Sequence, residues 1–166
     1  MTYKFCDPVR LSHECHTSDF DCGVESLNTY LKKYALQHQK GQGAWTYVVL
    51  SGEDIAGYFT LCYGSVAPKE APQRIGQVLG LYPIPIMILA RLAVDKRFQG
   101  QGLGEALLKH ALLKTLNAAE IAGLRAVVVH AKDEAAKDFY KRYGFIESPI
   151  DAFHLFLLCK DMRHNL

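Results

Sequence analysis

The sequence predicts one domain of the α/β class, in which helices flank a mixed β-sheet of the α+β type. The chain has 166 residues, a length typical of one domain, and 49% of them are hydrophobic, which supplies a sizeable core. Apolar, β-branched runs typical of strands alternate with segments of helical spacing. Because no repeat, low-complexity tract or long linker interrupts the chain, we expect a single domain over residues 1–166.

The first part of the chain predicts a helix followed by a β-hairpin. Residues 19–39, DFDCGVESLNTYLKKYALQHQ, predict a helix that Asp19 or Asp21 caps. Residues 44–51 and 55–65 predict two strands, and the Gly-Glu-Asp between them indicates a turn. The buried face predicted for the helix consists of Val24, Leu27, Leu31, Tyr34 and Ala35.

The middle of the chain predicts a loop, a strand and a helix. Prolines and glycines in residues 66–83 predict the loop. Residues 84–94, IPIMILARLAV, predict a buried strand that ends at Asp95, and residues 103–116 predict a helix. The apolar positions of that helix are Leu103, Ala106, Leu107, His110, Ala111 and Leu113.

The last part of the chain predicts strand, helix and strand. Residues 125–131 form a short apolar run, and residues 133–145 predict a helix that Gly144 closes as a C-cap. Residues 151–161 predict a final strand. The expected order is roughly β-α-β-β-β-α-β-α-β.

Composition excludes several classes of protein. The five cysteines are scattered without a CxxC pair, so they predict neither a zinc site nor a disulfide framework. The sequence shows no signal-peptide pattern, and its most apolar segment is too short to span a bilayer, which predicts a cytoplasmic protein without membrane association. Residues 91–166 contain 12 Lys and Arg against 9 Asp and Glu. This excess suits an anionic ligand, although an ordinary solvated surface explains it as well.

A glycine-rich stretch immediately precedes the helix predicted over residues 103–116. Gly100, Gly102 and Gly104 place flexible backbone at a helix start, where free amides and the helix dipole favour an anion. Arg97 can add a charged contact to a phosphate. A tight turn needed only for packing is the alternative. The spacing matches neither a Walker A loop nor a dinucleotide-binding fingerprint.

The pattern R-x-x-G-x-G at residues 97–102 resembles the pyrophosphate loop of the GCN5-related N-acetyltransferase (GNAT) family, whose members bind acetyl-coenzyme A. The preceding LARLAVD resembles that family's central strand, and DEAAKDFYKRYGF resembles its motif N-x-x-A-x-x-x-Y with a terminal Gly-Phe. Asp133 replaces the usual asparagine, and an ionised aspartate cannot donate a hydrogen bond. The coenzyme contacts that the resemblance implies are Leu92, Val94, Arg97, Gly100, Gln101, Gly102, Leu103, Gly104, Asp133 and Ala136.

The resemblance also implies the catalytic groups. Tyr140 corresponds to the general acid that protonates the coenzyme A sulfur, and its phenol is protonated at neutral pH. The backbone amide of Val94 is the expected oxyanion donor. No general base is evident: His130 is the better candidate, His110 fits a half-buried structural role, and a bound water serves as well. We expect no metal.

Near-verbatim segments over residues 5–160 resemble one GNAT subgroup, the toxins of bacterial toxin–antitoxin pairs that acetylate the α-amine of charged tRNA. This resemblance implies an aminoacyl-tRNA substrate, a homodimer, and an antitoxin whose ribbon-helix-helix domain binds DNA, so that the toxin meets DNA only through it. Residues 66–83 and 153–159 are candidate dimer-interface segments. The basic residues expected to face tRNA are Arg91, Lys96, Arg97, Lys132, Lys137, Lys141 and Arg142.

Two other functions are compatible with the sequence. One is acetylation of a small-molecule amine or a protein N-terminus, for which an acidic acceptor pocket would be expected. The other is a binding module without catalysis, for which neither Tyr140 nor the glycine loop would be needed.

Overall fold

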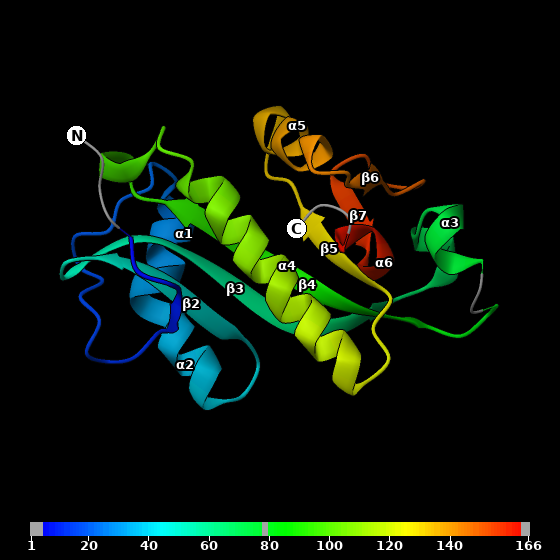
Figure 1. Ribbon diagram of the computed structural model, residues 1–166, viewed down its shortest axis with the longest axis horizontal. Helices are drawn as coiled ribbons and strands as arrows, with labels where there is room; N and C mark the ends of the chain where they lie inside the picture. Colours follow the sequence, from blue (N-terminus) through cyan, green and yellow to red (C-terminus); the bar gives the residue numbers. More distant parts are fainter. Residues whose placement is uncertain (1–4, 78–79, 164–166) are drawn as a thin grey trace. The chain divides into compact units, whose positions relative to one another are not determined.

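The computed structural model describes residues 5–77 and 80–163 (Figure 1). Contacts divide the chain into two compact units: residues 1–62 with 90–111, and residues 63–89 with 112–166. Strands β3 (Asp54–Val66) and β4 (Ile84–Val94) and helix α4 (Leu103–Ile121) each contribute residues to both units.

The described residues contain a sheet of seven strands, hydrogen-bonded in the order β1-β2-β3-β4-β5-β7-β6. The β4–β5 pair is parallel, whereas the pairs β1–β2, β2–β3, β5–β7 and β7–β6 are antiparallel. The predicted mixed sheet with flanking helices is therefore confirmed. The other strands are β1 (Val9–Arg10), β2 (Trp45–Ser51), β5 (Ala126–His130), β6 (Ile146–Glu147) and β7 (His154–Leu158).

In the first unit, the helix predicted over residues 19–39 is shorter and interrupted. It consists of α1 (Glu25–Thr29), a π-helical turn η1 (Tyr30–Tyr34) and α2 (Ala35–Lys40). The predicted Asp19 or Asp21 cap is wrong, because Val24 holds the N-cap position without a side-chain hydrogen bond. The predicted burial of Tyr34 is also wrong: the residue is 48% exposed, since a π turn holds an extra residue and rotates the following side chains.

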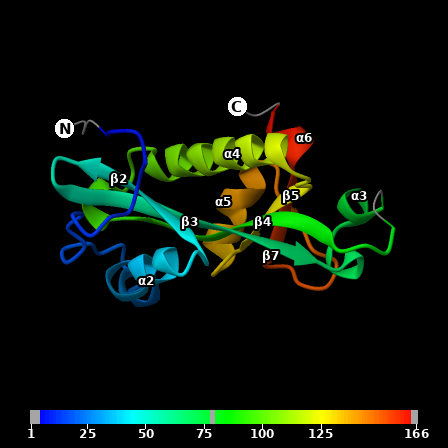
Figure 2. The same ribbon diagram turned by 90° about the horizontal axis from the view of Figure 1, so that it is seen from below.

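The core of the first unit lies between these helices and strands β2, β3 and β4. Figure 2 shows α2 and the start of α4 on opposite faces of β2 and β3. Gly57 of β3 lies under α4, and a Cβ there would be 2.9 Å from Leu107 Cδ1 and 3.0 Å from the Ala93 carbonyl oxygen. Only glycine therefore allows this close packing. The core residues are Leu11, Phe20, Tyr30, Leu31, Ala35, Val48, Ile55, Tyr58 and Ala93.

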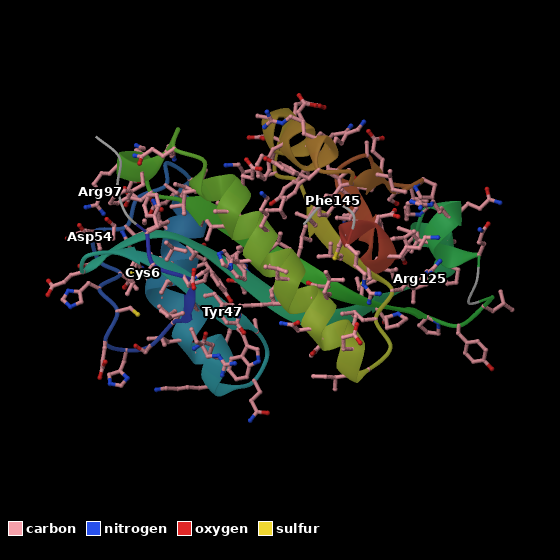
Figure 3. All side chains as sticks on the ribbon, viewed as in Figure 1. Cys6, Tyr47, Asp54, Arg97, Arg125 and Phe145 are labelled. Atoms are coloured by element: carbon pink, nitrogen blue, oxygen red, sulfur yellow. The ribbon has the colours of Figure 1, made fainter. Side chains whose placement is uncertain are left out.

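In the second unit, the segment predicted as a loop over residues 66–83 contains short helices. These are the 3₁₀ turn η2 (Pro68–Glu70) and helix α3 (Gln73–Gly76); residues 78–79 lie outside the described part. The Arg125 side chain, labelled in Figure 3, donates from Nε to the Ile75 carbonyl oxygen at 3.1 Å. Ile75 is fully buried, so apolar packing and this hydrogen bond hold α3.

The helix and the final strand predicted near the C-terminus are both present, but each is shorter than predicted. Helix α5 (Glu134–Arg142) is followed by Gly144 at φ +94°, which confirms the predicted C-cap glycine. Strand β7 ends at Leu158 and continues into α6 (Cys159–Met162). Because β7 lies between β5 and β6 with residues 155–158 buried, the proposed interface segment 153–159 is mostly internal.

Helix α4 extends to Ile121, beyond the predicted end at residue 116. Leu113 is 46% exposed, which corrects its predicted burial, whereas Leu108 and Leu112 are buried.

Candidate functional site

The glycine loop joins β4 to α4 within the first unit. After the 3₁₀ turn η3 (Lys96–Phe98), Gly100 and Gly102 adopt φ +80° and +81°, and α4 begins at Leu103. No atom lies within 4 Å of a Cβ built on either glycine, so open space borders the loop. Positive φ is the reason for glycine at both positions. Gly104 lies in the first turn of α4.

The Arg97 side chain bonds to carboxylates of its own chain. Its Nε donates to Asp95 Oδ1 at 2.9 Å, and its Nη1 lies 3.4 Å from Asp54 Oδ2. Figure 3 shows Arg97 beside Asp54. No local pattern predicts this pairing, because Asp54 and Arg97 are distant along the chain.

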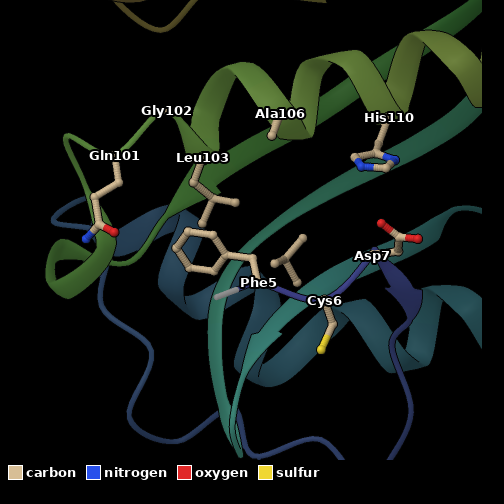
Figure 4. Close-up of a pocket in the computed structure, with 9 residues that line it drawn as sticks. Phe5, Cys6, Asp7, Gln101, Gly102, Leu103, Ala106 and His110 are labelled. Carbon is tan, nitrogen blue, oxygen red and sulfur yellow. The ribbon is translucent and has the colours of Figure 1, made fainter. Parts of the chain in front are cut away.

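A cavity of about 200 Å³ borders the glycine loop within the first unit (Figure 4). Gln101, Gly102 and Leu103 line one side of it, and the N-terminal residues Phe5, Cys6 and Asp7 line another. His110 of α4 points into the same cavity and is half-buried, as predicted. No local motif predicts the N-terminal residues of this cavity, because their position depends on tertiary contacts.

The end of β4 contains two predicted coenzyme contacts and one predicted tRNA contact. Leu92 and Val94 are half-buried, and the Val94 carbonyl oxygen accepts a hydrogen bond from Gln99 Nε2 at 2.8 Å. The Arg91 guanidinium lies over the Tyr30 ring at 3.5 Å from its centroid. Arg91 therefore already has an aromatic partner.

Helix α5, in the second unit, contains the predicted catalytic tyrosine. Asp133 is its N-cap, and Oδ1 accepts from the Ala136 amide at 2.8 Å. The structure thus gives Asp133 and Ala136 a local helix-capping role. Tyr140 is 6% exposed, and its ring packs on Phe139 and Phe145 with centroids 5.1 and 5.4 Å away. Burial raises the pKa of Tyr140 above its ordinary value, so the phenol keeps its proton at neutral pH.

Comparisons with known proteins identify this architecture. A family profile described as "Acetyltransferase (GNAT) domain" matches residues 42–147. The chain belongs to the GNAT acetyltransferase family. A "tRNA-acetylating toxin" of Mycobacterium tuberculosis is 40% identical over 156 residues, covering 94% of this chain and 93% of the relative. The acetyltransferase prediction is confirmed.

Solved structures agree over the whole GNAT chain. A variant of KacT matches with TM-score 0.90 and 29% identity, covering 100% of both chains. AtaT complexed with acetyl-methionyl-tRNAfMet matches with TM-score 0.89 and 27% identity, covering 97% and 98%. A variant of AtaT bound to acetyl-CoA and the C-terminus of antitoxin AtaR matches with TM-score 0.82 and 27% identity, covering 97% of each chain.

The basic residues that we expected to face tRNA are largely paired within this GNAT chain. Lys137 and Lys141 of α5 both contact Glu147 Oε1 of β6, at 2.9 and 3.0 Å. Hydrogen bonds from Lys137 and then Lys141 hold the pKa of Glu147 below its ordinary value. Lys96 lies 3.6 Å from Asp21 Oδ2. The basic patch is therefore less positive than a count of lysines and arginines predicts.

Two histidines meet in the second unit, at the last residue of β5 and the first residue of β7. His130 of β5 and His154 of β7 are cross-strand partners whose ring centroids are 3.4 Å apart. Burial, and then the neighbouring His154, lower the pKa of His130, against a smaller opposite effect of Asp151. His130 is thus mostly neutral at pH 7, as a general base must be.

Metal and membrane features are absent from the part of the chain that the structure describes. In residues 5–77 and 80–163, no three His, Cys, Asp or Glu side chains are grouped to hold a metal ion. None of the five cysteines, which all lie within these ranges, forms a disulfide. None of the helices in these ranges has the length and hydropathy needed to cross a bilayer.

Proposed function

We propose that this chain is the toxin of a toxin–antitoxin pair and transfers an acetyl group from acetyl-coenzyme A to the α-amine of the amino acid on charged tRNA. The observation that carries the proposal is the 40% identity to a tRNA-acetylating toxin, of which the match covers 93%. An acetylated α-amine cannot accept the growing peptide, so the product blocks translation.

The glycine loop has the features needed to hold the coenzyme's diphosphate. Gly100 and Gly102 leave open space where a side chain would otherwise lie, and the first amides of α4 have no intrahelical acceptor. The residues expected to bind here are Gly100, Gln101, Gly102, Leu103 and Gly104. Leu92 and Val94 of β4 are expected to pair with the pantetheine arm.

Bound acetyl-coenzyme A supplies an acyl group activated as a thioester. The α-amine nitrogen forms a bond to the acyl carbon while the carbon–sulfur bond breaks. Burial raises the pKa of Tyr140, so its phenol is protonated; it donates this proton to the departing sulfur, and the phenolate is reprotonated at the end by the proton that the amine releases. The Val94 amide is the expected donor to the acyl oxygen. His130 or water takes the proton that the amine loses.

The same proposal includes the partners. We expect a homodimer, an antitoxin whose ribbon-helix-helix domain binds DNA, and DNA contact only through that antitoxin. Charged tRNA as the acceptor places the activity in the cytoplasm. Residues 66–83 stay a candidate dimer segment, with Leu81 and Tyr82 97% and 79% exposed.

The decisive experiment incubates the purified chain with labelled acetyl-coenzyme A and a pool of charged tRNAs. We expect label on aminoacyl-tRNA, and none on the same pool after its aminoacyl ester is hydrolysed. Label on polyamines or protein N-termini, with none on charged tRNA, would support the small-amine alternative instead. Incorporation that Tyr140→Phe leaves unchanged would contradict the role of Tyr140.

A further inference from the structure

The segment before α1 is tied to the segment that leads into the glycine loop, and both belong to the first unit. The Asp21 amide donates to Asp95 Oδ2 at 3.0 Å, and the Lys96 amide donates to the Asp21 carbonyl oxygen at 2.8 Å. Gln99 Nε2 adds a hydrogen bond to the Cys22 carbonyl oxygen at 3.2 Å. Residues 21–22 therefore fix the backbone of residues 95–99.

The Asp95 carboxylate is the centre of this connection. Its side chain is 2% exposed, and Oδ1 accepts from both the Arg97 amide and Arg97 Nε at 2.9 Å. Oδ2 accepts from Arg97 Nη2 at 3.1 Å as well as from the Asp21 amide. Burial alone would raise the pKa of Asp95, but the hydrogen bonds from the Arg97 side chain and the two amides outweigh it and lower the pKa. The buried group thus stays ionised and fully hydrogen-bonded.

The charges around Arg97 argue against a direct phosphate contact. Its guanidinium is held by Asp95 and faces Asp54, so one positive charge lies among two negative charges. A diphosphate approaching this group meets a net negative charge and competes with a two-pronged carboxylate contact. The first amides of α4, by contrast, have no intrahelical acceptor, and open space borders Gly100 and Gly102.

We propose that Asp95 and Arg97 are positioning residues, which fasten the start of the glycine loop to residues 21–22, and that the Arg97 guanidinium is not itself a ligand of the coenzyme's diphosphate. This inference rests on the proposed function. It differs from the direct phosphate contact that the R-x-x-G-x-G resemblance implies for the arginine.

The test is calorimetry of coenzyme A binding to the intact chain at several KCl concentrations, using Asp95→Asn, Arg97→Gln and Arg97→Lys. If Arg97 positions the loop, all three variants bind about tenfold more weakly, because a displaced loop loses several amide contacts together. Arg97→Lys resembles Arg97→Gln, since a lysine cannot make the two-pronged contact. The salt dependence of binding stays that of the wild type.

If Arg97 contacts the phosphate directly, the variants should change coenzyme affinity and its salt dependence in a different way. Asp95→Asn would then free Arg97 and tighten binding, Arg97→Lys would retain most of the affinity, and Arg97→Gln would reduce the salt dependence. Any of these results overturns the proposal. If Asp95→Asn does not fold, the comparison of Arg97→Lys with Arg97→Gln decides alone.

A double variant and a control complete the design. Asp95→Asn with Arg97→Gln should lose no more affinity than either single change, since both remove one connection. Arg163→Gln removes another ion-paired arginine, the partner of Glu120 at 3.1 Å, and should leave coenzyme affinity unchanged. A wild-type chain that gives no heat with coenzyme A would instead contradict the proposed function itself.

Discussion

Glu147 partly neutralises Lys137 and Lys141 of α5, two of the basic residues that we propose to face tRNA. Removing the charge of Glu147 is the most direct test of that proposal. Glu147 Oε1 contacts the amines of both Lys137 and Lys141. The three side chains together carry +1, because two lysines share one carboxylate. Glu147→Gln keeps the shape of the side chain and raises this charge to +2.

The expected gain follows from that single charge. The carboxylate of Glu147 repels a phosphate bound nearby, but Lys141 and Glu147 are 47% and 35% exposed, so water screens this repulsion. Removing the charge should therefore tighten binding of charged tRNA by about fivefold at low salt. One further phosphate contact steepens the plot of log affinity against log salt by about 0.9. The lost ion pairs are exposed, so their loss should change stability little.

The assay is filter binding of charged tRNA over a KCl series. Glu120→Gln is the matched control, since it makes the same change in charge beside Arg163. If Glu147→Gln gains no more than this control, or binds more weakly, the assignment of tRNA to α5 is wrong. Lys137→Gln with Lys141→Gln should weaken tRNA binding and spare coenzyme binding. Reversing both charges is a poorer test, because it would place three carboxylates together.

Further predictions concern catalysis, the loop and pH. Tyr140→Phe should lower the rate of acetyl transfer about 10²- to 10⁴-fold with little change in the coenzyme KM, as measured by steady-state kinetics, because only the acidic proton is lost. Gly102→Ala should cost about 1 to 2 kcal/mol in thermal unfolding, since its φ of +81° disfavours any side chain although space is open; an unchanged melting temperature would contradict this. The lowered pKa of His130 means that the unfolded chain binds a proton more readily, so stability should fall as pH drops below about 6.5. His130→Gln should reduce that slope between pH 7.5 and 5, and an unaltered slope would exclude His130 as its source.

Local signals were sufficient for the hairpin, the central strand and the glycine loop. The Gly-Glu-Asp turn, the apolar run at residues 84–94 and the C-cap Gly144 each depend on nearby residues, so the sequence could predict them. The π turn at Tyr30–Tyr34 could not be predicted in this way, because no residue in this segment is a local signal for it. The exposure of Leu113 and Tyr34 could not be predicted either, because helical spacing alone does not say which side chains the folded chain covers.

Charge was the least predictable property of the candidate site. Arg97 looked like a phosphate ligand from its motif, yet Asp54 and Asp95 hold it. Asp21 reaches Asp95 across 74 positions of sequence, which no local pattern encodes. A count of lysines likewise overlooks Glu147. Side-chain partners decide which cations are free, and those partners come together only on folding.

The missing side chain at position 57 connects the hydrophobic interior to coenzyme affinity. A methyl group there would push against Leu107, and also against Leu103 at 3.3 Å, the residue at which α4 begins. Any larger amino acid at this point would have to displace these two side chains at the start of α4. A substitution at this buried strand position would therefore reach the proposed coenzyme site indirectly, through Leu103, which lines the cavity beside the glycine loop.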